Sequence, residues 1–402
     1  MSRFRTLEDL ETAGLLKGAE VLVRIDLNVP VTDGRITDTT RIDRSMDTIR
    51  ELIAQGSKVV ILAHFDRPKG KRVPEMSLGP VAEAVGHVLG RPVKFAGDCV
   101  GPLAEDAVSR LGPGDVLVLE NTRFHPGEEK NDPAFARALA GLGQAYVNDA
   151  FSCAHRAHAS TAGIARLLPS AAGRAMEAEL EALDAALGSP DRPLAALVGG
   201  SKVSTKLDLL TNLVSQVNVL VIGGGMANTF LAAEGHPVGR SMHEPDRLDT
   251  AREILARASA AGCDVVLPTE GVFARAVERG AATRVGPIAE IRPEEMILDV
   301  GPSGLSRIEE KLAACRTIVW NGPLGVFEVP PFDAGTVRIA RFVAARVEEG
   351  EMVAVAGGGD TAAALAHAGV TDGFTYVSTA GGAFLEWLEG KELPGVAALM
   401  ER

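Results

Sequence analysis

The feature that most constrains the fold is the alternation of short apolar runs with amphipathic stretches along nearly all of the 402 residues. Short apolar runs bounded by glycine or polar residues are typical of strands buried on both faces of a sheet. The helical patterns between them indicate βαβ units, which form parallel sheets covered by helices on both faces. Strands are predicted over residues 21–25, 58–63, 116–120, 145–148, 194–198, 217–222, 265–267, 317–320, 352–356 and 375–378.

About ten strands are many for one open sheet, and domains usually hold about 100–200 residues. The sequence therefore predicts an α/β protein with two doubly wound, Rossmann-like parallel-sheet domains. The best boundary lies near Gly173, where residues 174–187 show a helical stripe of apolar side chains that ends before Gly188. This helix is interpreted as a rigid connector. The alternative is an ordinary crossover helix inside one domain.

The charge and cysteine content exclude some function classes. The net charge is −12, so nucleic acids and anionic membrane surfaces are not expected partners. No run of 18 apolar residues occurs, and the first six residues lack the apolar segment of a secretory signal. The cysteines show no paired spacing, so we expect free thiols in a reducing cytoplasm. They are Cys99, Cys153, Cys263 and Cys315.

Four segments of the second half share one plan, an apolar strand followed by a small or glycine-rich turn and a helix. Such turns lie at the carboxyl ends of strands, where glycine allows close approach and helix N-termini attract phosphate. A single turn of this kind could also reflect tight packing of helix on strand. The turns are residues 199–202, 223–225, 357–361 and 379–382. Neither a Walker motif nor an H-R-D catalytic loop occurs, which excludes P-loop and protein kinases.

Three charged side chains of these segments are candidates for phosphate chemistry. Lys202 lies on a turn from which its ammonium could reach a phosphoryl group. Lys206 would share a helix face with Lys202, although a solvated surface lysine is an equal alternative. Asp360 follows three glycines and could cap a helix, hold Mg²⁺, or do both.

Basic and polar residues gather after the predicted strands of the first half. Arg24, Asp26 and Asn28 alternate with apolar residues, and they share one face if the strand persists to Asn28. In an acidic chain, positive charge at strand ends indicates a small polyanionic ligand, which arginine binds in bidentate fashion. The other members of this set are Arg41, His64, Arg67, Arg123, His155, Arg156 and His158.

Two other chemistries, a zinc site and a thiol nucleophile, have little support in these residues. His155 and His158 lie three positions apart but lack the further ligands that a zinc site needs. Cys153 lies near His155, yet no motif supports a thiol nucleophile, so a small buried cysteine is expected.

Taken together, these segments resemble phosphoglycerate kinase. The resemblance runs in order from about residue 21 to about residue 399. It is carried by residues 23–30, 119–129, 148–151, 154–161, 223–227, 319–328 and 357–361.

The resemblance implies a monomeric cytoplasmic glycolytic enzyme with two domains facing a cleft that closes. The enzyme would transfer a phosphoryl group from 1,3-bisphosphoglycerate to MgADP, giving 3-phosphoglycerate and MgATP. Residues 1–172 would bind 3-phosphoglycerate and residues 189–378 the nucleotide. Residues 173–188 would connect the two domains, and residues 379–402 would return to the first domain.

The resemblance also implies the site residues. Those expected to hold 3-phosphoglycerate are Asp26, Asn28, Arg41, His64, Arg67, Arg123 and Arg156. Those expected to hold the nucleotide are Lys202, Lys206, Gly225, Asn321, Glu328, Gly358, Gly359, Asp360 and Thr361, with Asp360 on Mg²⁺. The migrating phosphoryl group would be surrounded by Arg41, Lys202, Mg²⁺ and the helix N-termini at Gly225, Gly381 and Gly382.

The sequence departs from the family pattern at four positions. Asp66 and Ile297 stand where glycines are usual, Ser201 replaces an alanine, and Ala380 replaces the first of three glycines. Because Asp66 adds a carboxylate beside an anion site, substrate affinity is the property most affected. Two alternative hypotheses remain. One is another acid kinase, which would not need the basic cluster of the first half. The other is a nucleotide-binding regulatory module without activity.

Overall fold

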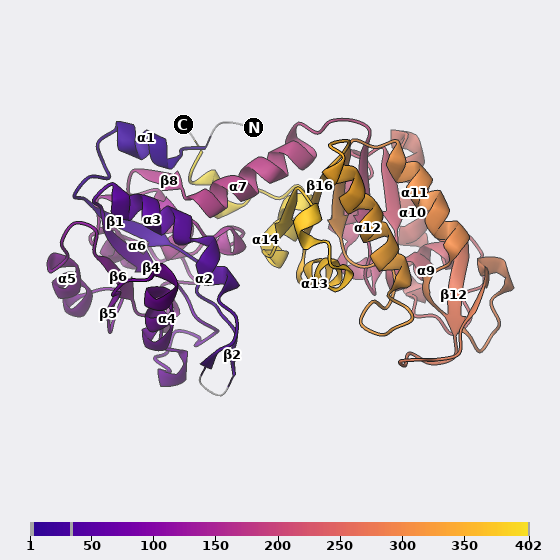
Figure 1. Ribbon diagram of the computed structural model, residues 1–402, viewed down its shortest axis with the longest axis horizontal. Coiled ribbons are helices and arrows are strands. Elements are labelled where there is room, and N and C mark those ends of the chain that lie inside the picture. Colours follow the sequence, from indigo (N-terminus) through magenta and orange to yellow (C-terminus); the bar gives the residue numbers. More distant parts are fainter. Residues whose placement is uncertain (1–3, 33–34, 401–402) are drawn as a thin grey trace. The chain divides into compact units, whose positions relative to one another are not determined.

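The computed structural model describes residues 4–32 and 35–400, and the chain divides into two compact units (Figure 1). The first unit holds the residues up to Leu180 and those from Glu392 onward, and the second unit is Glu181–Lys391. The first change of unit falls inside the predicted connecting helix. The domain boundaries at 172, 188 and 378 stay predictions.

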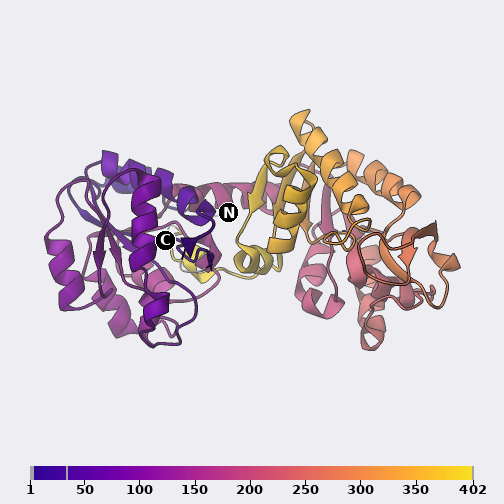
Figure 2. The same cartoon turned by 60° about the horizontal axis from the view of Figure 1, so that its bottom comes forward.

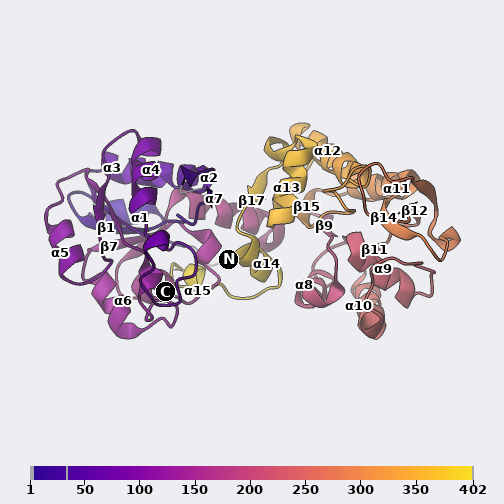
Figure 3. The same ribbon diagram turned by 90° about the horizontal axis from the view of Figure 1, so that it is seen from below.

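The first unit is built on a sheet of six parallel strands in the order β5-β6-β4-β1-β7-β8. Strands β1 and β4 are buried on both faces, as their nearly uninterrupted apolar sequence predicts. Because right-handed crossovers that run in opposite directions place helices on opposite faces, α3 and α4 cover one face and α5 and α6 the other (Figure 3). The strands are β1 (Glu20–Arg24), β4 (Lys58–Leu62), β5 (Lys94–Ala96), β6 (Val116–Leu119), β7 (Ala145–Asn148) and β8 (Ser170–Ala172).

The helices of this unit follow the apolar stripes of the sequence. In α3, for example, Met46, Ile49 and Leu52 are fully buried and join the core formed by β1 and β4. The α-helices are α1 (Leu7–Thr12), α2 (Thr40–Arg44), α3 (Met46–Ala54), α4 (Gly79–Leu89), α5 (Pro102–Ser109), α6 (Pro133–Ala140) and α15 (Pro394–Ala397).

The second unit repeats this plan with six parallel strands in the order β11-β10-β9-β15-β16-β17. The direction of the crossovers places α8, α9 and α10 on one face and α11, α12 and α13 on the other, as Figures 2 and 3 show. The strands are β9 (Leu194–Val198), β10 (Val219–Ile222), β11 (Asp264–Val266), β15 (Thr317–Asn321), β16 (Val353–Gly357) and β17 (Tyr376–Ser378). The helices are α8 (Leu207–Leu213), α9 (Gly224–Ala233), α10 (Leu248–Ala261), α11 (Pro302–Ala313), α12 (Ala334–Glu348), α13 (Gly359–Ala368) and α14 (Gly381–Leu388).

These two sheets confirm the predicted fold class, and each predicted strand is present with ends shifted by at most two residues. Several elements were not predicted. Strands β5 and β8 are short, and β8 consists of serine and alanine, which carry no strand signal. An antiparallel sheet of β13 (Arg284–Pro287), β12 (Glu270–Ala274) and β14 (Met296–Val300) was also missed, as was the hairpin of β2 (Val31–Thr32) and β3 (Arg35–Ile36).

The predicted helix over residues 174–187 is present as α7 (Arg174–Leu183), followed by a π-helical turn at Asp184–Gly188. Met176 and Leu183 of its apolar stripe are fully buried. The four cysteines are free, as expected, and all four are buried, as was expected for Cys153. Within the described ranges, no helix has both the length and the apolar character needed to cross a membrane.

Candidate active site

The basic residues of the first unit follow the carboxyl ends of neighbouring strands. His64 follows β4, Arg123 follows β6, and Arg156 lies in the segment after β7. Strands β6, β4, β1 and β7 are adjacent in the sheet. Because parallel strands end at the same edge, the fold brings together residues that are up to about a hundred positions apart in the chain.

Asp26, Asn28 and Arg41 gather at this edge, but not as the strand pattern predicted. Strand β1 ends at Arg24, so it does not persist to Asn28. Instead the Asp26 carboxylate accepts a hydrogen bond from the Asn28 amide at 2.9 Å, which turns the chain. The second carboxylate oxygen of Asp26 pairs with Arg41 at 2.5 Å and accepts from the Ser152 hydroxyl at 2.7 Å.

Arg24 fixes the chemical form of His64. Its Nη2 lies 2.8 Å from the His64 Nδ1, and a guanidinium can only donate. Nδ1 therefore accepts, and Nε2 carries the proton. Burial, followed by the charge of Arg24, holds the pKa of His64 well below its usual value. His64 is therefore a neutral imidazole whose Nε2–H can donate to an anion.

A buried carboxylate in turn anchors Arg24, which is itself fully buried. The Arg24 Nε donates to the Ser160 hydroxyl at 3.1 Å, and this hydroxyl donates to Glu128. The Ser160 amide donates to the other Glu128 oxygen at 3.0 Å. Nothing in the sequence pattern indicates this role for Glu128 or Ser160, although both lie in segments that carry the family resemblance.

Positive charge dominates the rest of this edge. The Arg123 side chain is only 4% exposed, and its Nη1 donates to the Asp66 carbonyl at 2.9 Å. Burial and the neighbouring charges of Arg123, Arg24 and Arg156 lower the pKa of His158 to about 3. Since both imidazoles stay neutral beside three guanidinium groups, the site is suited to an anion. Arg67 is exposed, and Arg156 is half-buried.

The departure at Asp66 has a backbone explanation. Asp66 adopts a φ of 52°, in the left-handed region that favours glycine and that aspartate tolerates better than most residues. Its amide donates to the Asn28 side chain at 2.8 Å, and its carbonyl accepts from Arg123. The loop therefore keeps the conformation that a glycine would allow.

In the second unit, Lys206 joins the predicted glycine-rich turn after β9 to the end of β15. Its Nζ donates to the Gly199 carbonyl and to both oxygens of Asn321, the side-chain oxygen at 2.6 Å. Burial lowers the pKa of Lys206 to about 8, opposed by the charge of Asp360. Lys206 is thus a partly buried side chain that connects the ends of β9 and β15, and not a solvated surface lysine.

A third segment is tied to the same place. The side-chain amide of Asn321 donates to the Gly357 carbonyl at 2.8 Å, and the Thr361 hydroxyl donates to the same carbonyl at 2.8 Å. The Gly322 amide donates to the Thr361 hydroxyl at 2.7 Å. A Cβ at Gly358 would lie 2.9 Å from the Asn321 amide nitrogen, so glycine is required there.

Helix N-termini converge beside these ties. A Cβ built at Gly381, the first residue of α14, would lie 3.8 Å from the backbone nitrogen of Gly359, the first residue of α13. A Cβ at Gly225, in the first turn of α9, would lie 2.9 Å from the Ser201 carbonyl. The unpaired N–H groups and partial positive charge of such termini favour phosphate.

Three predicted charged residues extend from this edge. Lys202, Glu328 and Asp360 are exposed, and their side chains make no hydrogen bond or ion pair with any described residue. Gly382 follows Gly381 in the first turn of α14. Ile297 packs beside the apolar cluster around Phe273 in the antiparallel sheet.

Comparison with known proteins places this architecture in one family. The family model described as phosphoglycerate kinase matches residues 8–391. The phosphoglycerate kinase of Sinorhizobium medicae is 60% identical over 399 residues, which is 99% of both chains. That of Sinorhizobium fredii is 59% identical over 396 residues, covering 98% of each chain.

Solved structures agree over the full length. The phosphoglycerate kinase structure from Coxiella burnetii matches with a TM-score of 0.91 and 41% identity over 99% of both chains. The structure from Pyrococcus horikoshii matches with a TM-score of 0.80 and 31% identity over 99% of this chain and 98% of the other. These comparisons give no support to a different acid kinase. The chain therefore belongs to the phosphoglycerate kinase family, the phosphotransferases that exchange a phosphoryl group between 1,3-bisphosphoglycerate and ADP in glycolysis.

Proposed function

We propose that the basic edge of the first unit holds the glycerate substrate and that the glycine-rich edge of the second unit holds the nucleotide. The observation that carries this division is the chemistry of the two edges. One edge combines arginines with neutral imidazoles, which suits a small anion with carboxylate and phosphate groups. The other combines helix N-termini with close-packed glycines, which suits the phosphates of ADP or ATP.

In the first site, Arg67, Arg123 and Arg156 neutralise the anionic groups of 3-phosphoglycerate, and the Nε2–H of His64 donates to it. Asp26 and Asn28 accept from the hydroxyl and support the loop around Asp66. Asp26 also holds Arg41, whose 38% exposed side chain can contact the phosphoryl group in transit.

In the second site, Gly225, Gly358, Gly359 and Thr361 supply the backbone and hydroxyl groups around the phosphates. Glu328 contacts the ribose, and Lys206 with Asn321 keeps the turns in register. The exposed Asp360 carboxylate at the start of α13 fits Mg²⁺, which binds through one or two carboxylates and phosphate oxygens. When bound, Mg²⁺ would neutralise phosphate charge.

The chemistry follows from positioning and charge. The carboxylate of 3-phosphoglycerate is already a nucleophile, so no general base is required, and neutral His64 acts only as a donor. Lys202, Arg41 and the N-terminus of α14 at Gly381 and Gly382 stabilise charge on the phosphoryl group as it passes between oxygens.

The activity is tested by a coupled assay with 3-phosphoglycerate and MgATP, in which the acyl phosphate formed is consumed with NADH oxidation. Turnover with 3-phosphoglycerate but not with acetate would support the assignment. Turnover with acetate alone would contradict it. We further propose a monomer in the cytoplasm, supported by the free thiols and the net charge of −12.

Arg123→Ala should weaken 3-phosphoglycerate binding by about 10- to 150-fold, because a charge-assisted hydrogen bond contributes about 1.5–3 kcal/mol. ADP binding should stay within twofold, since Arg123 belongs to the other unit. Isothermal titration of each ligand separately measures both affinities. An equal loss for the two ligands would contradict the proposed division of the sites.

Asp66→Asn should lower the KM for 3-phosphoglycerate by about two- to fivefold, because it removes a negative charge whose effect on a nearby anion is about 1 kcal/mol in water. Asparagine tolerates the left-handed φ, so the backbone keeps its shape. Steady-state kinetics with each substrate varied provide the test. Asp66→Gly is the matched variant, and an unchanged KM in both would show that Asp66 does not act on the substrate.

A further inference from the structure

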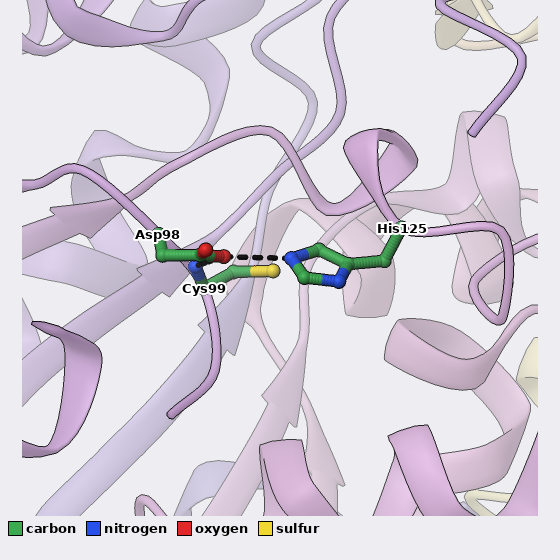
Figure 4. A group of neighbouring side chains, drawn as sticks. All are labelled: Asp98, Cys99 and His125. Atoms are coloured by element: carbon green, nitrogen blue, oxygen red, sulfur yellow. Dashed lines mark hydrogen bonds and ion pairs between the residues drawn. The ribbon is translucent and has the colours of Figure 1, made fainter. Parts of the chain in front are cut away.

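A group of three potential metal ligands lies in the first unit, outside the proposed substrate site. Figure 4 shows the Asp98 carboxylate and the Cys99 sulfur facing the same nitrogen of His125. One donor atom from each residue lies within 4.8 Å of the others, and the Asp98 oxygen is 2.6 Å from the His125 Nε2. In the described part of the chain, no other three His, Cys, Asp or Glu residues meet in this way.

The surroundings hold the three side chains in place. The Cys99 amide donates to the Asp98 carboxylate at 2.7 Å, and the ring of Phe135 stacks on His125 with centroids 5.0 Å apart. Cys99 is fully buried, whereas the Asp98 and His125 side chains are 28% and 30% exposed. An ion can therefore reach the donors from one side, and water can complete its coordination.

We propose that Asp98, Cys99 and His125 form a binding site for Zn²⁺. Sulfur, imidazole nitrogen and carboxylate oxygen are all zinc ligands, and donors around a tetrahedral zinc lie about 3.3–3.7 Å apart. The Asp98–His125 pair would open by about 0.7 Å to reach that spacing. Zn²⁺ takes the place of the hydrogen that joins Asp98 to the His125 Nε2, so His125 binds as the neutral tautomer with its proton on Nδ1, and the thiol proton of Cys99 passes to solvent.

The donor set distinguishes this site from alternatives. Mg²⁺ prefers oxygen ligands, so a site with sulfur and nitrogen selects against it. A reactive thiol is a poor alternative, because Cys99 is fully buried and a large oxidant or electrophile cannot reach it. Arg72, whose Nη2 lies 3.7 Å from the second Asp98 oxygen, is a nearby positive charge that lowers cation affinity.

The site is tested by titrating the whole chain with Co²⁺ as a spectroscopic substitute for Zn²⁺. We expect a thiolate-to-cobalt charge-transfer band that saturates at one ion per chain. Zn²⁺ should abolish it, and excess Mg²⁺ should not. The band should disappear in Cys99→Ser. In His125→Gln, whose side-chain amide can still donate to Asp98, the affinity for Co²⁺ should fall at least tenfold.

Cys263→Ser is the matched control, because Cys263 is also buried and also has an aspartate beside it in the sequence, but is not part of such a group. The Co²⁺ band of Cys263→Ser should be unchanged. Arg72→Ala should bind Co²⁺ several-fold more tightly, because it removes a positive charge near Asp98. If Cys99→Ser does not fold, as judged by circular dichroism, His125→Gln and Arg72→Ala decide the question. Absence of the band in the unmodified chain, or its persistence in Cys99→Ser, would overturn the proposal.

Discussion

Replacing Lys202 with alanine should lower kcat by about 100-fold or more, the scale observed when one electrostatic stabiliser of a transition state is lost. Lys202 is exposed, just after the glycines that follow β9, and its side chain makes no hydrogen bond or ion pair with any described residue. It is therefore free to follow the phosphoryl group, whereas Lys206 is held by Gly199 and Asn321. Steady-state kinetics in both directions measure the effect.

The folded state should not change, because the exposed Lys202 side chain makes no hydrogen bond or ion pair with any described residue. Lys311→Ala is a suitable control, since it removes another lysine of the same unit that pairs with Asp264 at 2.7 Å. Its kcat should stay within twofold of the original. If Lys202→Ala kept its kcat and only raised the nucleotide KM, Lys202 would act in ground-state binding and not in the transition state.

The parallel sheets could be predicted because their strands are continuous apolar runs, such as residues 194–198, separated by helical patterns. The antiparallel sheet of the second unit could not. Phe273 is fully buried in β12, but Gly271 on the same strand and Gly286 on its partner weaken the strand signal. Strand β8 forms because β7 offers it backbone partners, and this is tertiary information.

The candidate site also has features that could be predicted from local sequence and features that depend on contacts between distant residues. Glycine-rich turns after strands predicted where phosphate would bind, because the turn and the helix N-terminus are local features. The state of Lys206 could not be predicted, since its burial depends on Asn321, 115 positions away. The network behind His64 is equally non-local, because Arg24 reaches Ser160 across 136 positions. In the sequence, Asp66 is only a carboxylate placed beside an anion site. The structure also shows its φ of 52°, which explains why the position usually holds glycine.

Replacing Arg24 with methionine should lower the free energy of unfolding by about 3–5 kcal/mol, the cost of removing one partner of a buried charge network. Arg24 is fully buried, and its charge is compensated by Glu128 through the Ser160 hydroxyl. Methionine has a similar length and fills the space, so the loss reflects the uncompensated Glu128 and not a cavity. Urea unfolding followed by circular dichroism measures the change for the first unit.

The double variant Arg24→Met with Glu128→Gln separates charge from packing. Removing both charges should recover a large part of the lost stability, because replacement of a whole buried ion network is often neutral. It should not recover substrate affinity, since nothing then donates from position 24 to the His64 Nδ1 and the imidazole loses its fixed Nε2–H form. We expect the KM for 3-phosphoglycerate to stay raised while stability returns. Equal stability of the single and double variants would contradict the coupling between Arg24 and Glu128. Recovery of both properties together would show that Arg24 acts on the site only by keeping the unit folded.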